Sequence, residues 1–183
     1  MFSFEPVSEK DLTMVMAWID SPHVKAFWDN SPEHREDIKQ FATGRRVKSS
    51  YFDGVFSYWI GKCDGSPFCL VMTSPISQED DIPSLWRDFL SATGKTFSID
   101  FCIGNESFVG KGLAAGALEG FLAFFTSNVE PEAHVFLIDP DEENAKAQHV
   151  YAKAGFKLAG SFDMPSGYFS GKPTHLMIKI ASD

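Results

Sequence analysis

The sequence predicts an α/β protein in which a mixed central β-sheet of about six to seven strands is flanked by helices on both faces. Three observations support this fold class. Strand-like and helix-like segments alternate along the chain, a strong hairpin signal lies in the first half, and a strand, a glycine-rich turn and a helix follow one another in the second half. Since the 183 residues contain no repeat and no linker, we expect a single domain spanning residues 1–183.

The first segments combine a strand with two capped helices. Residues 2–7 alternate between apolar and polar side chains, as a strand does. Ser8 followed by Asp11 is a capping signal for a helix, which Pro22 ends. A second helix is expected to begin at Ser31, because this cap residue is followed by Pro and then by Glu.

The middle of the chain changes to a period of two. The β-rich runs 55–63 and 67–73 lie on either side of Asp64-Gly65, which is a typical turn of a β-hairpin. Residues 74–95 form a longer connection, which we expect to be a functional flap or to contain a short helix. The elements expected after the hairpin are a helix at 84–91, a strand at 97–103, a helix at 113–125, a buried strand at 133–138, a helix at 142–154 and a final strand pair at 156–162 and 174–180.

The composition excludes several classes of protein. Sixteen basic residues against 25 acidic ones give a formal charge of −9, which disfavours binding to nucleic acid or to an anionic membrane and leaves a cationic small molecule open. Three cysteines without metal-ligand spacing, and no signal-peptide opening, indicate free thiols in the cytoplasm and no metal. The apolar runs are too short or too interrupted to span a bilayer, so we expect a soluble protein that does not associate with membranes.

The turn Gly110-Lys111-Gly112 is the first candidate for chemistry. Two glycines let the backbone approach a ligand closely, and the N-terminus of the following helix favours phosphate. The alternative is a tight turn with no ligand. The dinucleotide fingerprint is not met because Ala115 occupies its last glycine position, and the nucleotide-binding pattern that ends in Gly-Lys-Ser/Thr is absent.

Several segments together resemble the GNAT superfamily of acetyl-CoA-dependent N-acetyltransferases, and within it the branch of aminoglycoside 6′-N-acetyltransferases. The specific part is Asp-Pro followed by Asn and then by Tyr-x-Lys-Ala-Gly-Phe. Residues 18–28 also resemble the opening of that branch, so the likeness covers nearly the whole chain. The segments that carry it are Ile99-Asp100-Phe101, residues 108–114, Ile138-Asp139-Pro140, Asn144, Ala147 and residues 151–156.

The resemblance implies acetyl-CoA as co-substrate and assigns residues to it. The backbone amides of the turn would hold the pyrophosphate, the end of the preceding strand would pair with the pantetheine arm, and an Asn would contact that arm. One position departs from the family pattern, since Phe108 stands where the turn commonly begins with Gln or Arg. The residues assigned in this way are Val109, Gly110, Lys111, Gly112, Leu113 and Ala114 for the pyrophosphate, and Phe101, Cys102, Ile103 and Asn144 for the arm.

An amine attacks a thioester only as the neutral base, so the site needs a proton acceptor within reach. Asp100 is the candidate, with an ordinary strand-end carboxylate as the alternative. Asp139 ends the next strand and would add negative charge for a cationic substrate. The resemblance implies that Tyr151 protonates the departing thiolate, and the alternative is a residue that only packs on the sheet. It also places the acidic run Glu79, Asp80 and Asp81 at the border of the acceptor site, and the alternative is an ordinary solvated loop.

The sequence therefore predicts direct acetyl transfer to a primary amine of a cationic, aminoglycoside-like small molecule, by a monomer or homodimer. Alternative acceptors are a polyamine, a siderophore precursor and a protein N-terminus. A module that binds acyl-CoA without catalysis is the alternative from another class. Cys102 as a covalent nucleophile is disfavoured, because it has no evident His partner and a small apolar role suffices. Trp28, Trp59 and Trp86 are expected in the core or at its rim.

Overall fold

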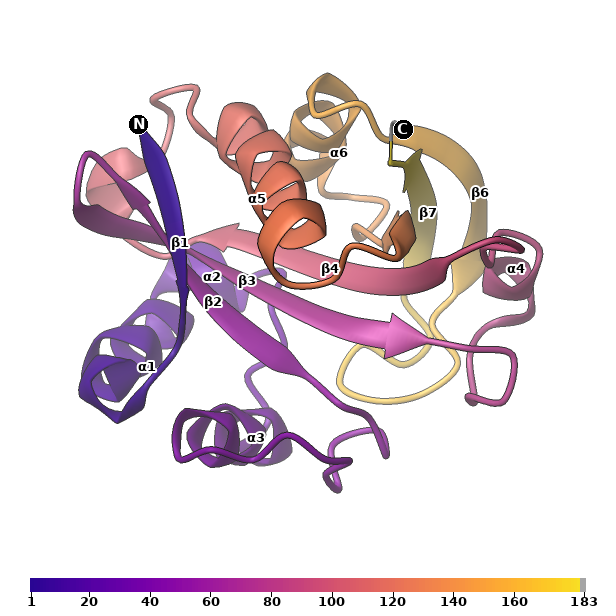
Figure 1. The fold of residues 1–183 in the computed structure, drawn as a ribbon, viewed down its shortest axis with the longest axis horizontal. Helices are drawn as coiled ribbons and strands as arrows, with labels where there is room; N and C mark the ends of the chain where they lie inside the picture. The colour runs from indigo at the N-terminus through magenta and orange to yellow at the C-terminus, as the bar shows by residue number, and fades with distance from the viewer. Residues whose placement is uncertain (182–183) are drawn as a thin grey trace. The chain divides into compact units, whose positions relative to one another are not determined.

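A computed structural model describes residues 1–181. Seven strands form a mixed sheet with the order β1-β2-β3-β4-β5-β7-β6 (Figure 1), and helices accompany them, so the predicted fold class is confirmed. The strands are β1 (Phe2–Pro6), β2 (Ser57–Cys63), β3 (Ser66–Ile76), β4 (Lys95–Ile103), β5 (Ala133–Ile138), β6 (Lys157–Asp163) and β7 (Pro173–Ile180). The α-helices are α1 (Leu12–Asp20), α2 (Pro22–Lys25), α3 (Pro32–Ala42), α4 (Ser84–Arg87), α5 (Ala114–Asn128) and α6 (Ala145–Lys153), and the 3-10 helices are η1 (Glu9–Asp11) and η2 (Glu106–Phe108).

The chain divides into two compact units. The first unit comprises Met1–Ser74 and Phe101–Leu113. The second comprises Pro75–Asp100 and the chain from Ala114 onward. Each unit has its own apolar cluster, and the two are described separately below.

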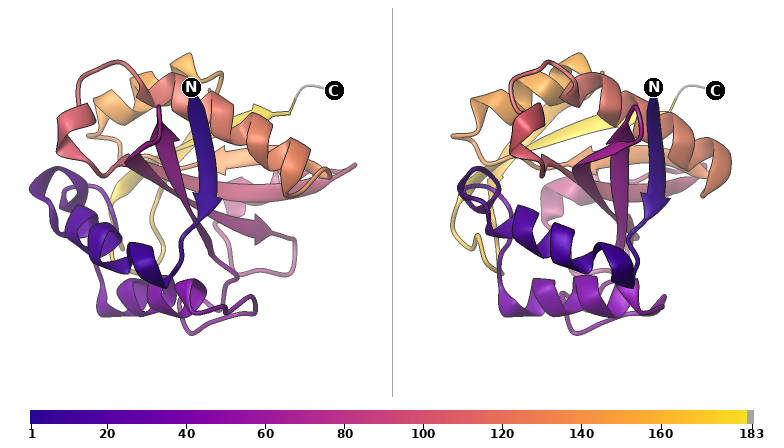
Figure 2. Two further views of the ribbon diagram at one scale, coloured as in Figure 1. Left: turned by 60° about the vertical axis from the view of Figure 1, so that its left-hand side comes forward. Right: turned by 90° about the vertical axis from the view of Figure 1, so that its left-hand side faces the viewer.

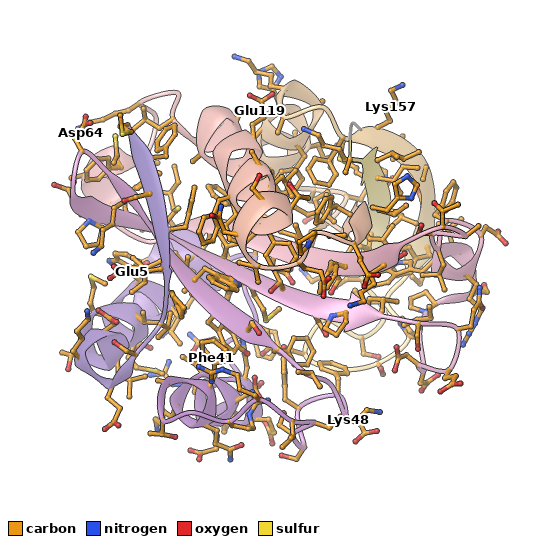
Figure 3. The ribbon with its side chains drawn as sticks, in the orientation of Figure 1. Glu5, Phe41, Lys48, Asp64, Glu119 and Lys157 are labelled. Carbon is orange, nitrogen blue, oxygen red and sulfur yellow. The ribbon has the colours of Figure 1, made fainter. Side chains whose placement is uncertain are left out.

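In the first unit, α1 and α3 lie on the same side of the antiparallel strands β1, β2 and β3 (Figures 1 and 2). The predicted caps form: the backbone N–H and hydroxyl of Ser8 both donate to Asp11, and the Ser31 hydroxyl accepts from the backbone of His34. Phe41 points from α3 toward the strands (Figure 3) and joins a core that includes Ile60 of β2. Other members of this core are Val15, Ile19, Ile38, Tyr58 and Leu70.

The hairpin between β2 and β3 turns where the sequence predicts it. Asp64 and Gly65 adopt φ angles of 48° and 81°, which is the two-residue turn that matches the twist of the flanking strands. Asp64 lies at the tip of the hairpin (Figure 3), and the N-terminal ammonium donates to its carboxylate over 2.6 Å. The prediction of a hairpin is therefore confirmed.

In the second unit, the sheet carries helices on both faces. On one face, the Phe125 ring of α5 lies 4.9 Å from Phe97 of β4 and 6.2 Å from Phe136 of β5, centroid to centroid. On the other face, Trp86 of α4 packs with Val135 and Leu137 of β5. The prediction of a strand buried on both faces at 133–138 is confirmed, because β5 supplies apolar side chains to both faces. Trp28, Trp59 and Trp86 are all buried, as expected.

Two helices differ from the sequence prediction at their ends. The helix expected at 142–154 begins only at Ala145, because the Asn144 side chain caps it by accepting the Ala147 N–H over 3.1 Å, and residues 141–143 form a turn instead. The helix expected at 84–91 stops at Arg87. The burial of Trp86 in the apolar cluster of the second unit fixes the position of this helix, and a single helical turn is enough to place Trp86 there.

A buried polar network joins α3 to the segment between α3 and β2 in the first unit. Asp37 is 2% exposed and accepts hydrogen bonds from the Tyr58 hydroxyl (2.7 Å), the Arg45 guanidinium (2.7 Å) and the Ser49 hydroxyl. Burial and the charge of Asp37 raise the pKa of Tyr58 well above its ordinary value, so Tyr58 donates as a neutral phenol. The network therefore holds the segment that leads into β2 against α3.

His34 lies beside this network and is 1% exposed. Its ring stacks on Tyr51 at 4.7 Å and 8°, and its Nδ1 donates to the backbone carbonyl of Asp29 over 2.8 Å. The neutral tautomer therefore carries its proton on Nδ1, and Nε2 is buried without a hydrogen-bond partner among residues 1–181. Burial lowers the pKa of His34, although the Asp29 carbonyl and the charges of Asp29 and Asp37 oppose this effect.

This environment predicts a pH dependence of stability. The folded-state pKa of such a His lies below its unfolded value of about 6.5. As the pH falls through and below 6.5, the unfolded chain binds a proton that the native state does not bind. The native state therefore loses stability relative to the unfolded chain. We expect His34→Phe to flatten the slope of unfolding free energy between pH 7 and 5.5 by up to about 1.4 kcal/mol per pH unit. Urea unfolding at several pH values measures it, with exposed His149→Gln as control. Equal slopes in both variants would contradict a neutral His34.

Candidate active site

Asp100 lies on β4, and Asp139 is the first residue after the neighbouring parallel strand β5. In the β4–β5 pair, Ser98 lies opposite Leu137, so Asp100 and Asp139 each lie two residues further toward the carboxyl ends of their strands. Side chains alternate along a strand, and Asp100 therefore belongs to the face of Leu137, opposite the face covered by α5. Both aspartates belong to the second unit and are half-buried. The structure brings together the two carboxylates that the sequence singled out.

The two carboxyl groups interact electrostatically. Burial raises the pKa of Asp139 well above its ordinary value, and the negative charge of Asp100 raises it further. Although part of the Asp139 residue is exposed to solvent, its carboxyl is the group that pays the desolvation cost. The pair thus holds a proton more tightly than two isolated aspartates, and a cation placed beside it would favour release of that proton.

The acidic run 79–81 is divided between a structural and an exposed part. The Asp80 carboxylate accepts from the backbone N–H and the hydroxyl of Ser77 over 2.7 and 2.9 Å, and Arg87 donates to the Asp80 carbonyl over 2.9 Å. Asp80 therefore shapes the loop. Glu79 and Asp81 are exposed and are the members of the run that present their charge to solvent.

The Gly110-Lys111-Gly112 turn has an open backbone. Gly110 and Gly112 adopt φ angles of 76° and 73°, a region that favours glycine, and a Cβ added at either position would meet no atom within 4 Å. Val109, Lys111 and Gly112 are exposed, and Leu113 is half-buried. Helix α5 begins at the next residue, Ala114, where the first-turn N–H groups have no partner within the helix. Such a turn fits a phosphate-bearing group such as CoA, because it offers backbone donors and open space.

The end of β4 lies in the first unit and carries the three residues expected along the pantetheine arm. Phe101 is buried, whereas Cys102 and Ile103 are half-buried. Cys102 packs against the apolar core of the first unit, in keeping with a small apolar filler. The Ile103 carbonyl accepts from His23 Nε2 over 2.9 Å, so this end of the strand is tied to α2.

Asn144 and Tyr151 both belong to the second unit, on or next to α6. The Asn144 carbonyl oxygen is engaged as the helix cap, which leaves its amide N–H groups as the part of the side chain suited to a ligand. Tyr151 is buried, with its ring centroid 6.3 Å from that of Phe156. A buried phenol is a suitable proton donor only when its hydroxyl reaches the reacting atoms.

Three features were not found by reading the sequence. These are the hydrogen-bond network around Asp37, the bond between His23 and Ile103, and the position of the Lys111 ammonium 5.1 Å from the centroid of the Phe108 ring. The expected lack of a metal site remains a prediction, and no group of three or more His, Cys, Asp or Glu side chains within residues 1–181 is arranged to hold a metal ion. None of the helices described is both long and apolar enough to cross a bilayer.

Comparisons with known proteins agree with this architecture. A family model described as an acetyltransferase (GNAT) domain matches residues 7–164. An aminoglycoside N(6′)-acetyltransferase type 1 of Klebsiella pneumoniae is 24% identical over 166 residues, which cover 88% of this chain and 76% of the relative.

Solved structures show the same fold. An aminoglycoside N(6′)-acetyltransferase of Legionella pneumophila superimposes with a TM-score of 0.74 at 23% identity, covering 98% of this chain and 91% of its own. The aminoglycoside acetyltransferase AAC(6′)-Ib in complex with coenzyme A and kanamycin gives 0.74 at 20% identity, covering 98% and 95%. Because the family model spans most of the sequence, the chain belongs to the GNAT family of acetyltransferases and is an N-acetyltransferase.

Proposed function

We propose that this enzyme transfers an acetyl group from acetyl-CoA directly to a primary amine of a cationic, aminoglycoside-like small molecule. The observation that carries the proposal is the pair Asp100 and Asp139, each two residues beyond a paired position of the parallel strands β4 and β5. Two neighbouring carboxyl groups suit an alkylammonium, because their negative charge attracts it. The relatives named as aminoglycoside acetyltransferases, one of them with kanamycin bound, support this class of acceptor.

Acetyl-CoA is the proposed co-substrate. The relative solved with coenzyme A supports this choice, as does the open turn from Val109 to Leu113, which continues into Ala114. The amides of this segment would hold the pyrophosphate without a basic surface, which suits a chain of formal charge −9. Phe101, Cys102, Ile103 and Asn144 are the proposed contacts of the pantetheine arm.

In the proposed reaction, Asp100 accepts a proton from the alkylammonium, which generates the neutral amine. The amine nitrogen then bonds to the thioester carbonyl carbon, and the carbon–sulfur bond breaks. Tyr151 gives its hydroxyl proton to the departing thiolate and recovers one from the nitrogen as the amide forms. Asp139, with Glu79 and Asp81 from the loop, would attract the cation, while Asp80 acts through the shape of that loop.

The test combines ligand binding with turnover. We expect acetyl-CoA at 100 times its Kd to raise the melting temperature by about 5–10 °C, which corresponds to roughly 2.7 kcal/mol for a chain of this length. A screen for thiol release with aminoglycosides, polyamines and N-terminal peptides then identifies the acceptor. We expect release with aminoglycosides, and a KM for them that rises with salt, because ions screen the attraction between the carboxylates and the cation.

The outcomes separate the alternatives. Release with polyamines or peptides alone would overturn the aminoglycoside-like acceptor. Stabilisation by acetyl-CoA without release across the whole panel would favour a module that binds acyl-CoA but does not catalyse transfer. No stabilisation by either acetyl-CoA or CoA would contradict the proposed co-substrate itself.

A further inference from the structure

Lys111 is exposed, and its ammonium lies over an aromatic ring. Its ammonium is 5.1 Å from the centroid of the Phe108 ring, a distance at which a cation is attracted to the π face. Within the described part of the chain this ammonium makes no ion pair with a carboxylate, unlike those of Lys62 and Lys95. Its positive charge therefore remains available to an anion at the Gly110–Gly112 turn.

The ring beneath Lys111 is itself fixed to the first unit. The Phe108 centroid lies 5.4 Å from that of Phe68 in β3, and Phe68 in turn stacks on Phe2 of β1 at 5.8 Å. A row of three aromatic rings thus connects β1 to the turn. Because the contact with Phe68 leaves the Phe108 ring little freedom to rotate away, Phe108 offers a stable surface to the lysine.

The backbone before Phe108 is held by the same strand. The N–H groups of Gly104 and Asn105 both donate to the Phe68 carbonyl, over 2.9 and 3.1 Å. The Asn105 amide donates to the Pro67 carbonyl over 3.3 Å, and its oxygen accepts the Ser107 N–H over 3.1 Å, which starts η2. Backbone bonds and ring contacts therefore hold Phe108 and the segment before it against Pro67 and Phe68 of β3.

We propose that Phe108 is a positioning residue, which holds the Lys111 ammonium beside the Gly110–Gly112 turn so that it contacts a phosphate of CoA. This inference rests on the proposed function. Phe108 occupies the position where the family turn commonly has a polar Gln or Arg, and a phenyl ring cannot bind phosphate itself. The ring instead supports the cation three residues later, and a long side chain that is already placed loses less freedom when the phosphate arrives.

The test measures the Kd of CoA by calorimetry, independently of turnover. We expect Lys111→Met to weaken CoA binding about tenfold, as loss of a charge-assisted contact does. Phe108→Leu should weaken it by about threefold, and the double variant should match Lys111→Met rather than multiply the two losses. Phe108→Tyr keeps the ring face and should restore wild-type affinity. Lys157→Met is the charge-matched control, since Lys157 projects into solvent from β6 (Figure 3).

A comparison of CoA with dephospho-CoA identifies the phosphate. If Lys111→Met no longer weakens binding when dephospho-CoA replaces CoA, the contact of Lys111 is to the 3′-phosphate. If the variant still binds dephospho-CoA more weakly than wild type does, the contact is to the pyrophosphate. Both results support the inference. Equal Kd values for Lys111→Met and Lys157→Met would overturn it, and multiplicative losses in the double variant would overturn the positioning by Phe108. A wild-type protein that does not bind CoA at all would instead contradict the proposed function.

Discussion

Replacement of Asp100 by Asn is expected to lower the kcat of amine acetylation at least about tenfold, and by about 10²–10⁴-fold if the full contribution of a general base is lost. The variant keeps the shape of the side chain and removes its ability to take a proton. At pH 7 an alkylammonium is mostly protonated, so without a base in the site only the small fraction of neutral amine in solution reacts. Steady-state kinetics with a saturating acceptor measures the effect.

The pH profile distinguishes a base from a group that only binds the amine. If Asp100 deprotonates the amine, the activity of Asp100→Asn should rise about tenfold per pH unit below the pKa of the amine, while the wild-type profile stays flatter. If Asp100 only holds the cation, the variant should show a raised KM and a profile parallel to that of the wild type. Wild-type kcat in Asp100→Asn would remove Asp100 from the mechanism.

Asp139→Asn is the matched comparison, because it removes a carboxyl at the equivalent position of the neighbouring strand. Since burial and the charge of Asp100 raise the pKa of Asp139, its share of the negative charge is small until a cation arrives. We therefore expect the KM of a cationic acceptor to rise more than kcat falls. A loss of kcat as large as that of Asp100→Asn would contradict separate roles for the two residues.

Cys102→Ala tests the covalent alternative in the same assay. Cys102 packs against the apolar core of the first unit, and a thiol in such a place acts as a small apolar side chain. We expect turnover within about threefold of wild type, as for a modest core truncation. Because Cys102 is also a proposed contact of the pantetheine arm, turnover is measured at saturating acetyl-CoA. A loss of kcat under these conditions, without loss of stability, would instead indicate an acetyl-enzyme.

The sequence was sufficient to predict the structure of a segment where interactions between neighbouring residues determine it. The Asp64-Gly65 turn and the apolar run 133–138 gave a hairpin and a buried strand at the expected places, because turn chemistry and period depend on neighbouring residues. Helix α6 begins three residues later than expected, because the side chain of Asn144 caps it.

Contacts between distant residues were beyond the same reasoning. The Tyr58–Asp37 bond joins residues 21 positions apart, and no period or motif indicates that a tyrosine on β2 will meet an aspartate on α3. For the candidate site, the segment pattern named Asp100 and Asp139, but the electrostatic coupling between them follows from the register of two parallel strands. Lys111 was identified as a charge near the turn, and only its contact with Phe108 shows where that charge is held.

The largest expected effect on stability is at Asp37. In Asp37→Ala the Arg45 guanidinium, whose side chain is 10% exposed, loses its charged partner and keeps only its bonds to the backbone carbonyls of Val47 and Phe56. Tyr58 and Ser49 also lose their acceptor. Removal of one member of a buried ion pair costs about 3–5 kcal/mol, because the remaining charge is neither hydrated nor paired. Urea unfolding at pH 7 should show this loss in the free energy of unfolding.

The Asp20–Arg35 pair is a matched control within the same unit. Arg35 donates to both carboxylate oxygens of Asp20 over 3.0 and 3.1 Å, but the Asp20 side chain is 49% exposed and the Arg35 side chain is 28% exposed. Water replaces such a bond, and we therefore expect Asp20→Ala to cost much less stability than Asp37→Ala. The double variant Asp37→Leu with Arg45→Met, which removes both buried charges, should be more stable than Asp37→Ala. If Asp37→Ala costs no more than Asp20→Ala, the Arg45 charge is rehydrated and the network does not hold the segment between α3 and β2 in place.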